Sequence, residues 1–143
     1  MIVQDLMSKN VISISPDENA ALAARLLARH NIGALPVCST DGKLRGIVTD
    51  RDIVLRCVAA ENSAEETKVR EIMTRGPTTV SPDSDLNEAT RLMSQTQVRR
   101  LPVVENGSLV GMLSLADIAR NGRFDMEASR ALSEISSNIT KRG

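Results

Sequence analysis

The chain has 143 residues, a length that suits a compact fold with a sizeable core. Lys and Arg together number 18, as do Asp and Glu, which leaves no formal net charge and no long basic run. Trp and Tyr are absent and Phe124 is the only phenylalanine, so the core must consist of Leu, Ile, Val, Ala and Met. Nucleic acid is not expected as a partner, because binding it needs a basic face and commonly stacking aromatic residues.

Other features of the composition argue against further classes of protein. The start, MIVQDLMSKN, has no signal-peptide pattern and no segment reaches membrane-spanning length, so a cytoplasmic protein without membrane contact is expected. Cys38 and Cys57 lack CxxC spacing and are predicted to be reduced thiols in or near the core. His30, the single histidine, is expected to be at the surface or partly buried and not catalytic. With no triad or metal-ligand cluster visible, we predict no enzyme, no metal site and no required cofactor.

The sequence contains one series of segments twice. Four pairs of matching segments recur in the same order: Met7-Ser8 with Met73-Thr74, Ser15-Pro16-Asp17 with Ser81-Pro82-Asp83, Leu35-Pro36-Val37 with Leu101-Pro102-Val103, and Gly46 with Gly111. Agreement spread over so much of the chain indicates a tandem duplication. The predicted fold class is α/β (α+β), with two β-α-β-β-α repeats.

The first half of each repeat is predicted to be a short strand followed by a helix. Val11–Ile14 and Thr78–Val80 are β-prone. The motifs SPDE (15–18) and SPDS (81–84) then predict helix starts with serine as the N-cap and proline in the first turn. Apolar residues continue at helical spacing in both copies: Ala20, Ala23, Ala24 and Leu27, then Leu86, Ala89 and Met93.

The second half of each repeat is predicted to be a hairpin followed by a helix. LPVC (35–38) and LPVV (101–104) read as strands. Turns at Thr40-Asp41-Gly42 and Glu105-Asn106-Gly107 lead to the second strands, Leu44–Val48 and Leu109–Leu113, and a helix follows each.

These elements divide the chain into a first domain (1–58), a linker (59–70), a second domain (71–121) and a helical tail (122–143). Asn121-Gly122 is expected to end the last helix of the second domain. The tail spaces Ala128, Leu132, Ile135 and Ile139 as a narrow apolar stripe. Two interpretations stay open, namely that the tail covers its own domain or that it forms a dimer contact.

The phrase G-h-h-[ST]-x-x-D occurs as GIVTDRD (46–52) and GMLSLAD (111–117), and it also has two interpretations. In a capping box, Thr49 or Ser114 caps the following helix while the aspartate reaches back. In a ligand site, the glycine allows close approach, the hydroxyl faces phosphate and the aspartate accepts hydrogen bonds from ribose hydroxyls. Asp, where a capping box prefers Glu, favours the ligand, and the two roles can coexist.

Together, the repeated unit, the SPD motif, the LPV strand and the glycine phrase resemble a tandem pair of CBS domains (a Bateman module) over about residues 1–121. The resemblance implies repeats related by a pseudo-two-fold axis, with clefts that bind AMP, ADP, ATP or S-adenosylmethionine. By position, it assigns thirteen ligand-binding residues: Ile12, Ser13, Ala34, Pro36, Thr49, Arg51 and Asp52 in the first copy, and Thr78, Thr79, Arg100, Pro102, Ser114 and Asp117 in the second.

The expected function is therefore that of a non-catalytic sensor of adenosine-containing ligands, forming a homodimer and regulating an unidentified protein. The alternative is a constitutive assembly protein with vestigial clefts. The copies differ, because Arg99-Arg100 stand where the first copy has Gly33-Ala34. We expect the two sites to differ in their preference for phosphate, since guanidinium geometry suits phosphate oxygens.

Overall fold

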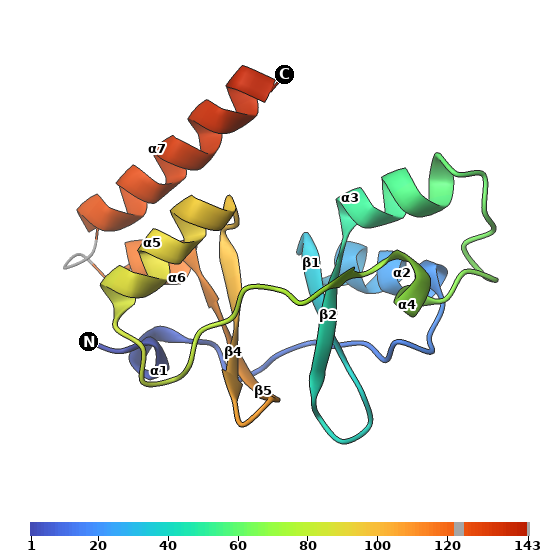
Figure 1. The fold of residues 1–143 in the computed structure, drawn as a ribbon, viewed down its shortest axis with the longest axis horizontal. Helices are drawn as coiled ribbons and strands as arrows, with labels where there is room; N and C mark the ends of the chain where they lie inside the picture. The colour runs from blue at the N-terminus through green and yellow to red at the C-terminus, as the bar shows by residue number, and fades with distance from the viewer. Residues whose placement is uncertain (122–124, 143) are drawn as a thin grey trace. The chain divides into compact units, whose positions relative to one another are not determined.

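The computed structural model describes residues 1–121 and 125–142 (Figure 1). Its helices and strands, in chain order, are α1 (Val3–Leu6), α2 (Ala20–His30), β1 (Ala34–Cys38), β2 (Leu44–Thr49), α3 (Asp50–Ile53), the π-helical turn η1 (Val54–Val58), α4 (Val69–Ile72), β3 (Thr74–Arg75), α5 (Leu86–Thr96), β4 (Arg100–Glu105), β5 (Ser108–Ser114), α6 (Leu115–Ala119) and α7 (Asp125–Arg142). They form two compact units. The first-copy unit comprises residues 12–77 and 107–109, and the second-copy unit comprises residues 1–11, 78–106 and those from 110 onward.

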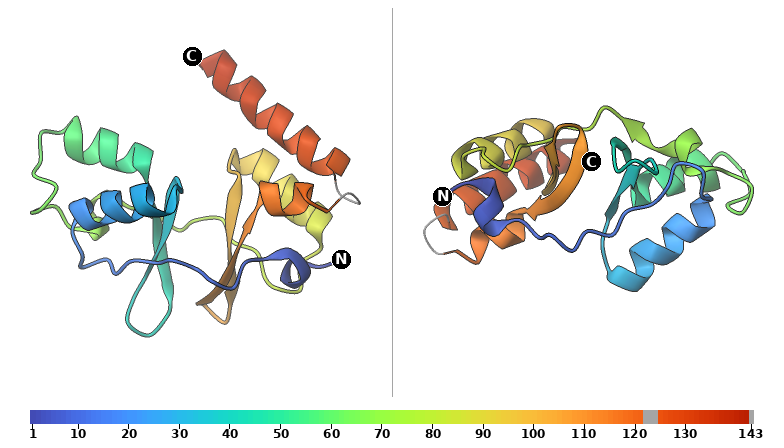
Figure 2. Two further views of the ribbon diagram at one scale, coloured as in Figure 1. Left: turned by 180° about the vertical axis from the view of Figure 1, so that it is seen from behind. Right: turned by 90° about the horizontal axis from the view of Figure 1, so that it is seen from below.

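The first-copy unit is built on an antiparallel sheet with strand order β1-β2-β3. In its register Ala34 lies opposite Thr49, and Leu35 opposite Val48. Ile14 extends the sheet with a single parallel bridge to Val37. Leu35, Val37 and Val48 are fully buried in an aliphatic core that also takes in the apolar side of α2. Figure 2 shows the helices gathered on one side of these strands.

The second-copy unit repeats this plan with β4 and β5 as its sheet. Val80 bridges to Val103 as Ile14 does to Val37, and Ser8 bridges to Met112. Helices α5, α6 and α7 belong to this unit, and α7 packs against both of the others (Figures 1 and 2). The core is again aliphatic, with Leu101 and Leu113 among its fully buried residues.

A short helix precedes each repeat in the chain, but it belongs to the compact unit of the other repeat. Helix α1 belongs to the second-copy unit, where Val3 is fully buried and its backbone N–H donates to the Ser84 carbonyl oxygen at 2.8 Å. Helix α4 belongs to the first-copy unit, where the Val69 N–H donates to the Glu18 carbonyl oxygen, also at 2.8 Å. The compact units are therefore not continuous segments of sequence.

Several predicted elements are confirmed. The LPV segments form β1 and β4, and the strands that enter the glycine phrases are β2 and β5. The second hairpin turns through Asn106 and Gly107, whose φ angles are 53° and 81°. These two left-handed residues give the tight turn that the Asn-Gly pair predicts.

The predicted helix starts at Ser15 and Ser81 are wrong. Residues 15–18 form a turn, in which the Asp17 N–H donates to Ser15 Oγ at 3.2 Å, and α2 begins only at Ala20. Asn19 is the N-cap, and its Oδ1 accepts from the Leu22 N–H at 2.8 Å. Asp85 takes the same position before α5. Asn19 and Asp85 are held extended by bridges to Lys68 and Ile2, so neither helix can begin earlier.

Smaller differences concern the strands, the linker and the tail. The predicted first strands reduce to single bridging residues, Ile14 and Val80. Ala24 is exposed. The last residues of the predicted linker enter α4, where Val69 is buried. The helix before the tail ends at Ala119, ahead of Asn121, and Gly122 lies outside the described residues.

The tail does form a helix, but a different face of it is buried. Ala131 and Ile135 are 1% and 2% exposed, whereas Leu132 is 41% exposed. The side chains of Ala128 and Ile139 lie outside those that the structure describes. Because α7 packs on α5 and α6, it covers its own unit, and a dimer contact through the tail stays a prediction.

Candidate functional site

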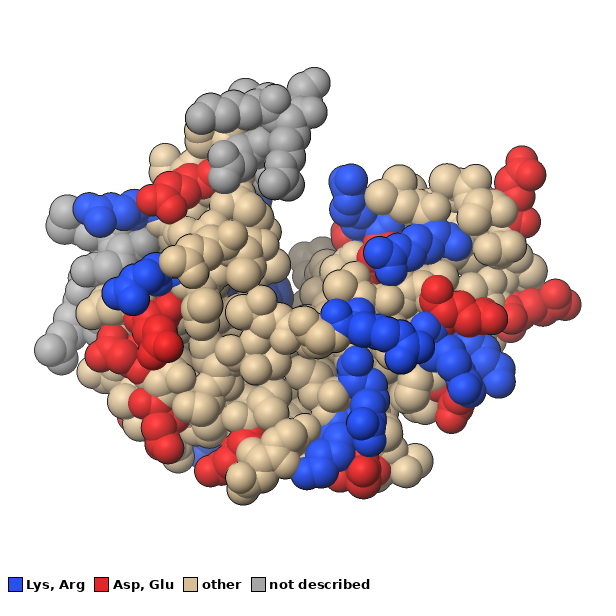
Figure 3. Space-filling model, viewed as in Figure 1, with Lys and Arg blue, Asp and Glu red and all other residues tan. Residues whose placement is uncertain are grey.

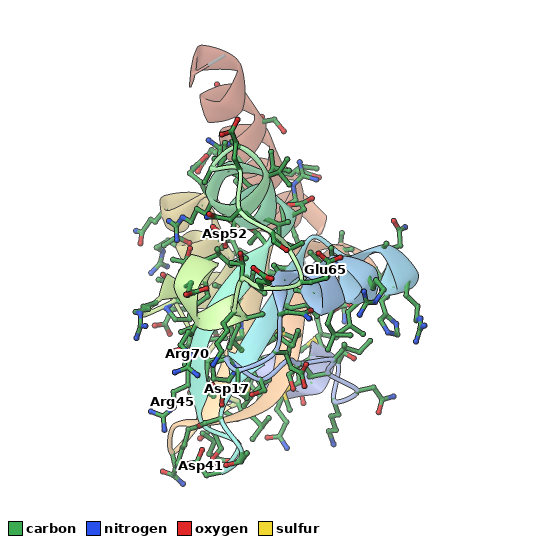
Figure 4. All side chains as sticks on the ribbon, turned by 90° about the vertical axis from the view of Figure 1, so that its right-hand side faces the viewer. Asp17, Asp41, Arg45, Asp52, Glu65 and Arg70 are labelled. Atoms are coloured by element: carbon green, nitrogen blue, oxygen red, sulfur yellow. The ribbon has the colours of Figure 1, made fainter. Side chains whose placement is uncertain are left out.

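In the first copy, the glycine phrase carries the chain from β2 into α3. Thr49 is the N-cap, and its Oγ1 accepts from the Asp52 N–H at 3.0 Å, while Asp52 Oδ2 accepts from the Thr49 N–H at 3.0 Å. The second oxygen, Oδ1, faces Thr74 Oγ1 at 3.5 Å and Arg56 Nε at 3.9 Å. Asp52 is only 8% exposed, at the start of α3 in Figure 4.

The second copy repeats this arrangement at the start of α6. Ser114 Oγ accepts from the Asp117 N–H at 3.0 Å, and Asp117 Oδ2 accepts from the Ser114 N–H at 3.2 Å. Asp117 Oδ1 is paired with Arg120 Nη1 at 3.2 Å. The Asp117 side chain is 21% exposed, against 11% for that of Asp52, so the second carboxylate is the more accessible one.

Both copies therefore contain the capping box that the sequence predicts. One carboxylate oxygen is committed to the cap, and the other faces only side chains. Arg120 is 76% exposed, and an ion pair at the surface contributes little, about 0–1 kcal/mol. Asp117 can thus keep its capping bond while its Oδ1 exchanges the arginine for another donor.

The glycine of each phrase has a structural explanation that does not involve a ligand. A Cβ on Gly46 would lie 2.6 Å from the Thr74 carbonyl oxygen, and one on Gly111 would lie 2.9 Å from the Ser8 carbonyl oxygen. The close approach that glycine permits is thus to the chain's own Met-Thr or Met-Ser segment. The prediction that these glycines allow the close approach of a ligand is therefore wrong.

Backbone hydrogen bonds bring the start of the LPV strand next to each phrase. The Asp50 N–H donates to the Gly33 carbonyl oxygen at 3.2 Å, and the Leu115 N–H donates to the Arg99 carbonyl oxygen at 2.8 Å. These bonds place Ala34 beside Thr49 and Arg100 beside Ser114. Arg51 follows Thr49 at the start of α3 and is exposed.

The remaining predicted residues lie on the first segment of each repeat or, for the two prolines, on the strand to which that segment is hydrogen-bonded. Ile12 and Ser13 lead to Ile14, whose N–H donates to the Pro36 carbonyl oxygen at 3.0 Å. Thr78 and Thr79 likewise lead to Val80, which donates to Pro102 at 3.1 Å. Both prolines are buried, so they act through their backbone carbonyl oxygens and do not present an exposed ring.

Cys38 lies next to one of these residues. Burial raises the pKa of the Cys38 thiol, and a hydrogen bond with Ser13 offsets part of that rise. Cys57 is buried, and both cysteines are free, as predicted.

A pocket of about 320 Å³ opens in the second-copy unit beside the glycine phrase, and its size falls at the lower end of the usual range for small-ligand sites. Its lining consists of Arg99, Arg100, Ser114, Leu115, Ala116, Ala119, Ser129 and Leu132. Arg100 and Ser114 were predicted. The sequence does not predict that the apolar residues of α6 and the two residues of α7 line this pocket, although Leu132 belongs to the tail's apolar stripe.

Basic residues gather on the first-copy unit, where Figure 3 shows several Lys and Arg side chains together. The exposed basic residues of β2, β3 and α4 are Arg45, Arg70 and Arg75. Arg45 pairs with Asp41 at 3.7 Å, and Arg70 pairs with Asp17 (Figure 4). Acids thus neutralise part of this basic surface.

Two further properties belong to the part of the chain that the structure describes. Within it, no three His, Cys, Asp or Glu side chains are grouped so that they could hold a metal ion. Within the same residues, no helix combines the length and apolar character that crossing a bilayer requires.

Comparison with known proteins identifies the fold. The CBS domain family matches residues 3–58 and 69–123. The chain belongs to the CBS domain family. The CBS domain-containing protein YhcV of Bacillus subtilis is 40% identical over 134 residues, which cover 94% of each chain. This chain is thus similar to stand-alone CBS pairs, which are regulatory modules rather than catalysts.

Two solved CBS structures carry adenosine compounds. The CBS domain pair of protein MJ0100, in complex with 5′-methylthioadenosine and S-adenosyl-L-methionine, matches with a TM-score of 0.74 and 32% identity, covering 84% of this chain and 94% of that one. CBSX2 in complex with AMP also gives a TM-score of 0.74, with 29% identity, covering 85% of this chain and 95% of that one. These two structural neighbours therefore bind adenosine-containing ligands.

Proposed function

We propose that this CBS pair is a regulatory module that binds an adenosine-containing ligand (AMP, ADP, ATP or S-adenosylmethionine) at the glycine phrases. The observation that carries the proposal is the pocket beside Ser114, because it combines two serine hydroxyls, two guanidinium groups and an apolar wall. The ligands of MJ0100 and CBSX2 support the adenosine class. Occupancy would regulate a protein that is not identified.

Within this proposal, Asp52 and Asp117 accept hydrogen bonds from the ribose hydroxyls through Oδ1. An ionised carboxylate only accepts hydrogen bonds, and two adjacent hydroxyls are suitable donors. The ribose would replace Arg120 at Asp117, and Thr74 with Arg56 at Asp52. Since Asp117 is the more accessible carboxylate, the second copy is the stronger site.

The arginines favour a phosphate-bearing ligand at the second copy. Arg99 and Arg100 have no ion-pair partner among the described residues, and their guanidinium groups suit phosphate oxygens. The first copy has Gly33 and Ala34 at these positions and offers Arg51 instead. Arg100→Ala should therefore weaken the binding of AMP and leave that of 5′-methylthioadenosine, which has no phosphate, nearly unchanged.

Titration calorimetry with AMP, ATP and S-adenosylmethionine tests the proposal. Asp117→Asn is the suitable variant, because its amide oxygen can still cap α6 while the charge is lost. Affinity should fall about tenfold or more, since a hydrogen bond to a charged group contributes about 1.5–3 kcal/mol. Asp83→Asn is the matched control, because Asp83 is an exposed acid of the same unit that lies outside the glycine phrase.

The proposal fails if none of the three compounds binds the wild-type protein near millimolar concentration. It also fails if Asp117→Asn keeps the affinity of the wild-type protein, as the control Asp83→Asn is expected to do. A quicker observation is an absorbance scan. Without Trp or Tyr, copurified nucleotide should dominate the spectrum at about 260 nm.

A constitutive homodimer with vestigial ligand sites is the second candidate. Three apolar residues of η1 support it, because Val54, Leu55 and Val58 are 55%, 50% and 64% exposed. Apolar surface of this kind is typical of association sites. Sedimentation analysis of Leu55→Glu should show a monomer if these residues form the interface. A dimer that persists in this variant would contradict that assignment.

A further inference from the structure

Helix α7 is attached to the second-copy unit by one face. Ala131 and Ile135, one helical turn apart, are 1% and 2% exposed, and Ala131 belongs to the core cluster that contains Met93 and Ile118. This face packs against α5 and α6. Among the described side chains of α7, the buried face is therefore a narrow strip formed by Ala131 and Ile135.

A neighbouring face of the same helix lines the pocket beside the glycine phrase. Ser129 and Leu132 share this pocket with Arg100 and Ser114. Leu132 remains 41% exposed there, next to the apolar side chains of Leu115, Ala116 and Ala119. A ligand in the pocket would remove this apolar surface from water, which favours binding.

We infer that α7 is part of the second-copy ligand site, with Leu132 contacting the ligand, so that ligand binding stabilises the docking of α7 on its unit. The inference rests on the proposed function. The tail would then respond to ligand binding. A ligand that contacts both α6 and α7 makes all of its contacts only when α7 is docked on its unit. Anything that binds one state preferentially shifts the equilibrium toward that state.

Leu132→Ala tests the contact, with AMP as the probe. The affinity for AMP should fall about five- to tenfold, as expected for losing part of a buried apolar side chain. The ligand-free melting temperature should stay close to that of wild type, because Leu132 is not in the core. Leu132→Met should restore binding, and Glu88→Ala, which shortens an exposed side chain of the same unit outside the pocket, should leave it unchanged.

Hydrogen exchange tests the coupling. AMP should slow amide exchange in residues 129–137 of the wild-type protein, and less so in Leu132→Ala. If AMP binds but Leu132→Ala has wild-type affinity and the exchange of α7 does not change, the inference is overturned while the proposed function stands. Weaker affinity without slower exchange keeps the contact and overturns the coupling. If AMP, ATP and S-adenosylmethionine all fail to bind wild type, the proposed function and this inference fail together.

Discussion

At the scale of single residues, Gly46 and Gly111 are fixed by the backbone that crosses them. Alanine at either position would place its Cβ within 3 Å of a carbonyl oxygen that cannot move independently of its strand or bridge. Gly46→Ala and Gly111→Ala should each lower the free energy of unfolding by about 1–3 kcal/mol, the usual effect of overpacking. Urea unfolding measures this.

Gly33→Ala is the matched control for these two variants. Its Cβ would lie no closer than 3.9 Å to Asp50, an ordinary contact, and the backbone at Gly33 does not require glycine. Its stability should remain near that of wild type. Equal destabilisation of all three variants would contradict the account of the glycine phrase as a close backbone crossing.

The Cys38 thiol is a chemical probe of the environment of Ser13, with which it forms a hydrogen bond. Because burial raises its pKa, the protonated thiol predominates at neutral pH, and the thiolate that reacts with iodoacetamide forms only as the pH rises through that raised value. Alkylation of native protein should be slow at neutral pH and accelerate in alkaline solution, as followed by mass spectrometry. Cys38→Ser should remove this reaction, because the other thiol, Cys57, is buried. Rapid labelling at neutral pH would contradict the prediction.

At the scale of elements, the caps decide where α2 and α5 begin. Asn19→Ala should lower stability by about 1 kcal/mol, because it removes the acceptor for the Leu22 N–H. Ser15→Ala should change stability by less than about 0.5 kcal/mol, because Ser15 lies in a turn ahead of the helix. Thermal unfolding followed by circular dichroism compares the two variants. A larger effect at Ser15 would restore the helix start predicted from the sequence.

The elements that the sequence predicts well are those with a local signal. The LPV strands, the Asn106-Gly107 turn and the capping boxes each depend on residues close together in the chain, and the duplication reinforces every signal. Helices α1 and α4 were not predicted, because each is a single turn stabilised by a partner distant in sequence. The helix caps were misplaced for a similar reason, since the bridges from Asn19 to Lys68 and from Asp85 to Ile2 cannot be read locally.

The candidate site divides in the same way. Motif positions identified Ser114 and Arg100, which do line the pocket. The contribution of α7 could not be predicted, because apolar spacing shows that a helix has a buried face but not which residues lie beside it. The stripe contained Ile135, which is buried, and Leu132, which lines the pocket instead.

At the scale of the whole molecule, the boundaries of a folding unit differ from those of a repeat. Residues 12–77 retain α4, whose Val69 and Ile72 are 0% and 2% exposed in the first-copy core. We expect this fragment to unfold cooperatively on heating, whereas residues 1–68 should not, because they keep α1 and lack α4. Circular dichroism melting curves make the comparison. The prediction is contradicted if residues 1–68 melt as sharply as residues 12–77.

The exchange of α1 and α4 has a consequence for how a duplicated chain of this kind can arise. A polypeptide with a single repeat would carry a leading helix that suits another repeat, and it would lack the helix that completes its own core. Two such polypeptides could satisfy each other by reciprocal swapping, and their stability would then depend on concentration. Fusing the two genes would make the swap intramolecular, so the fused chain stays folded at any dilution.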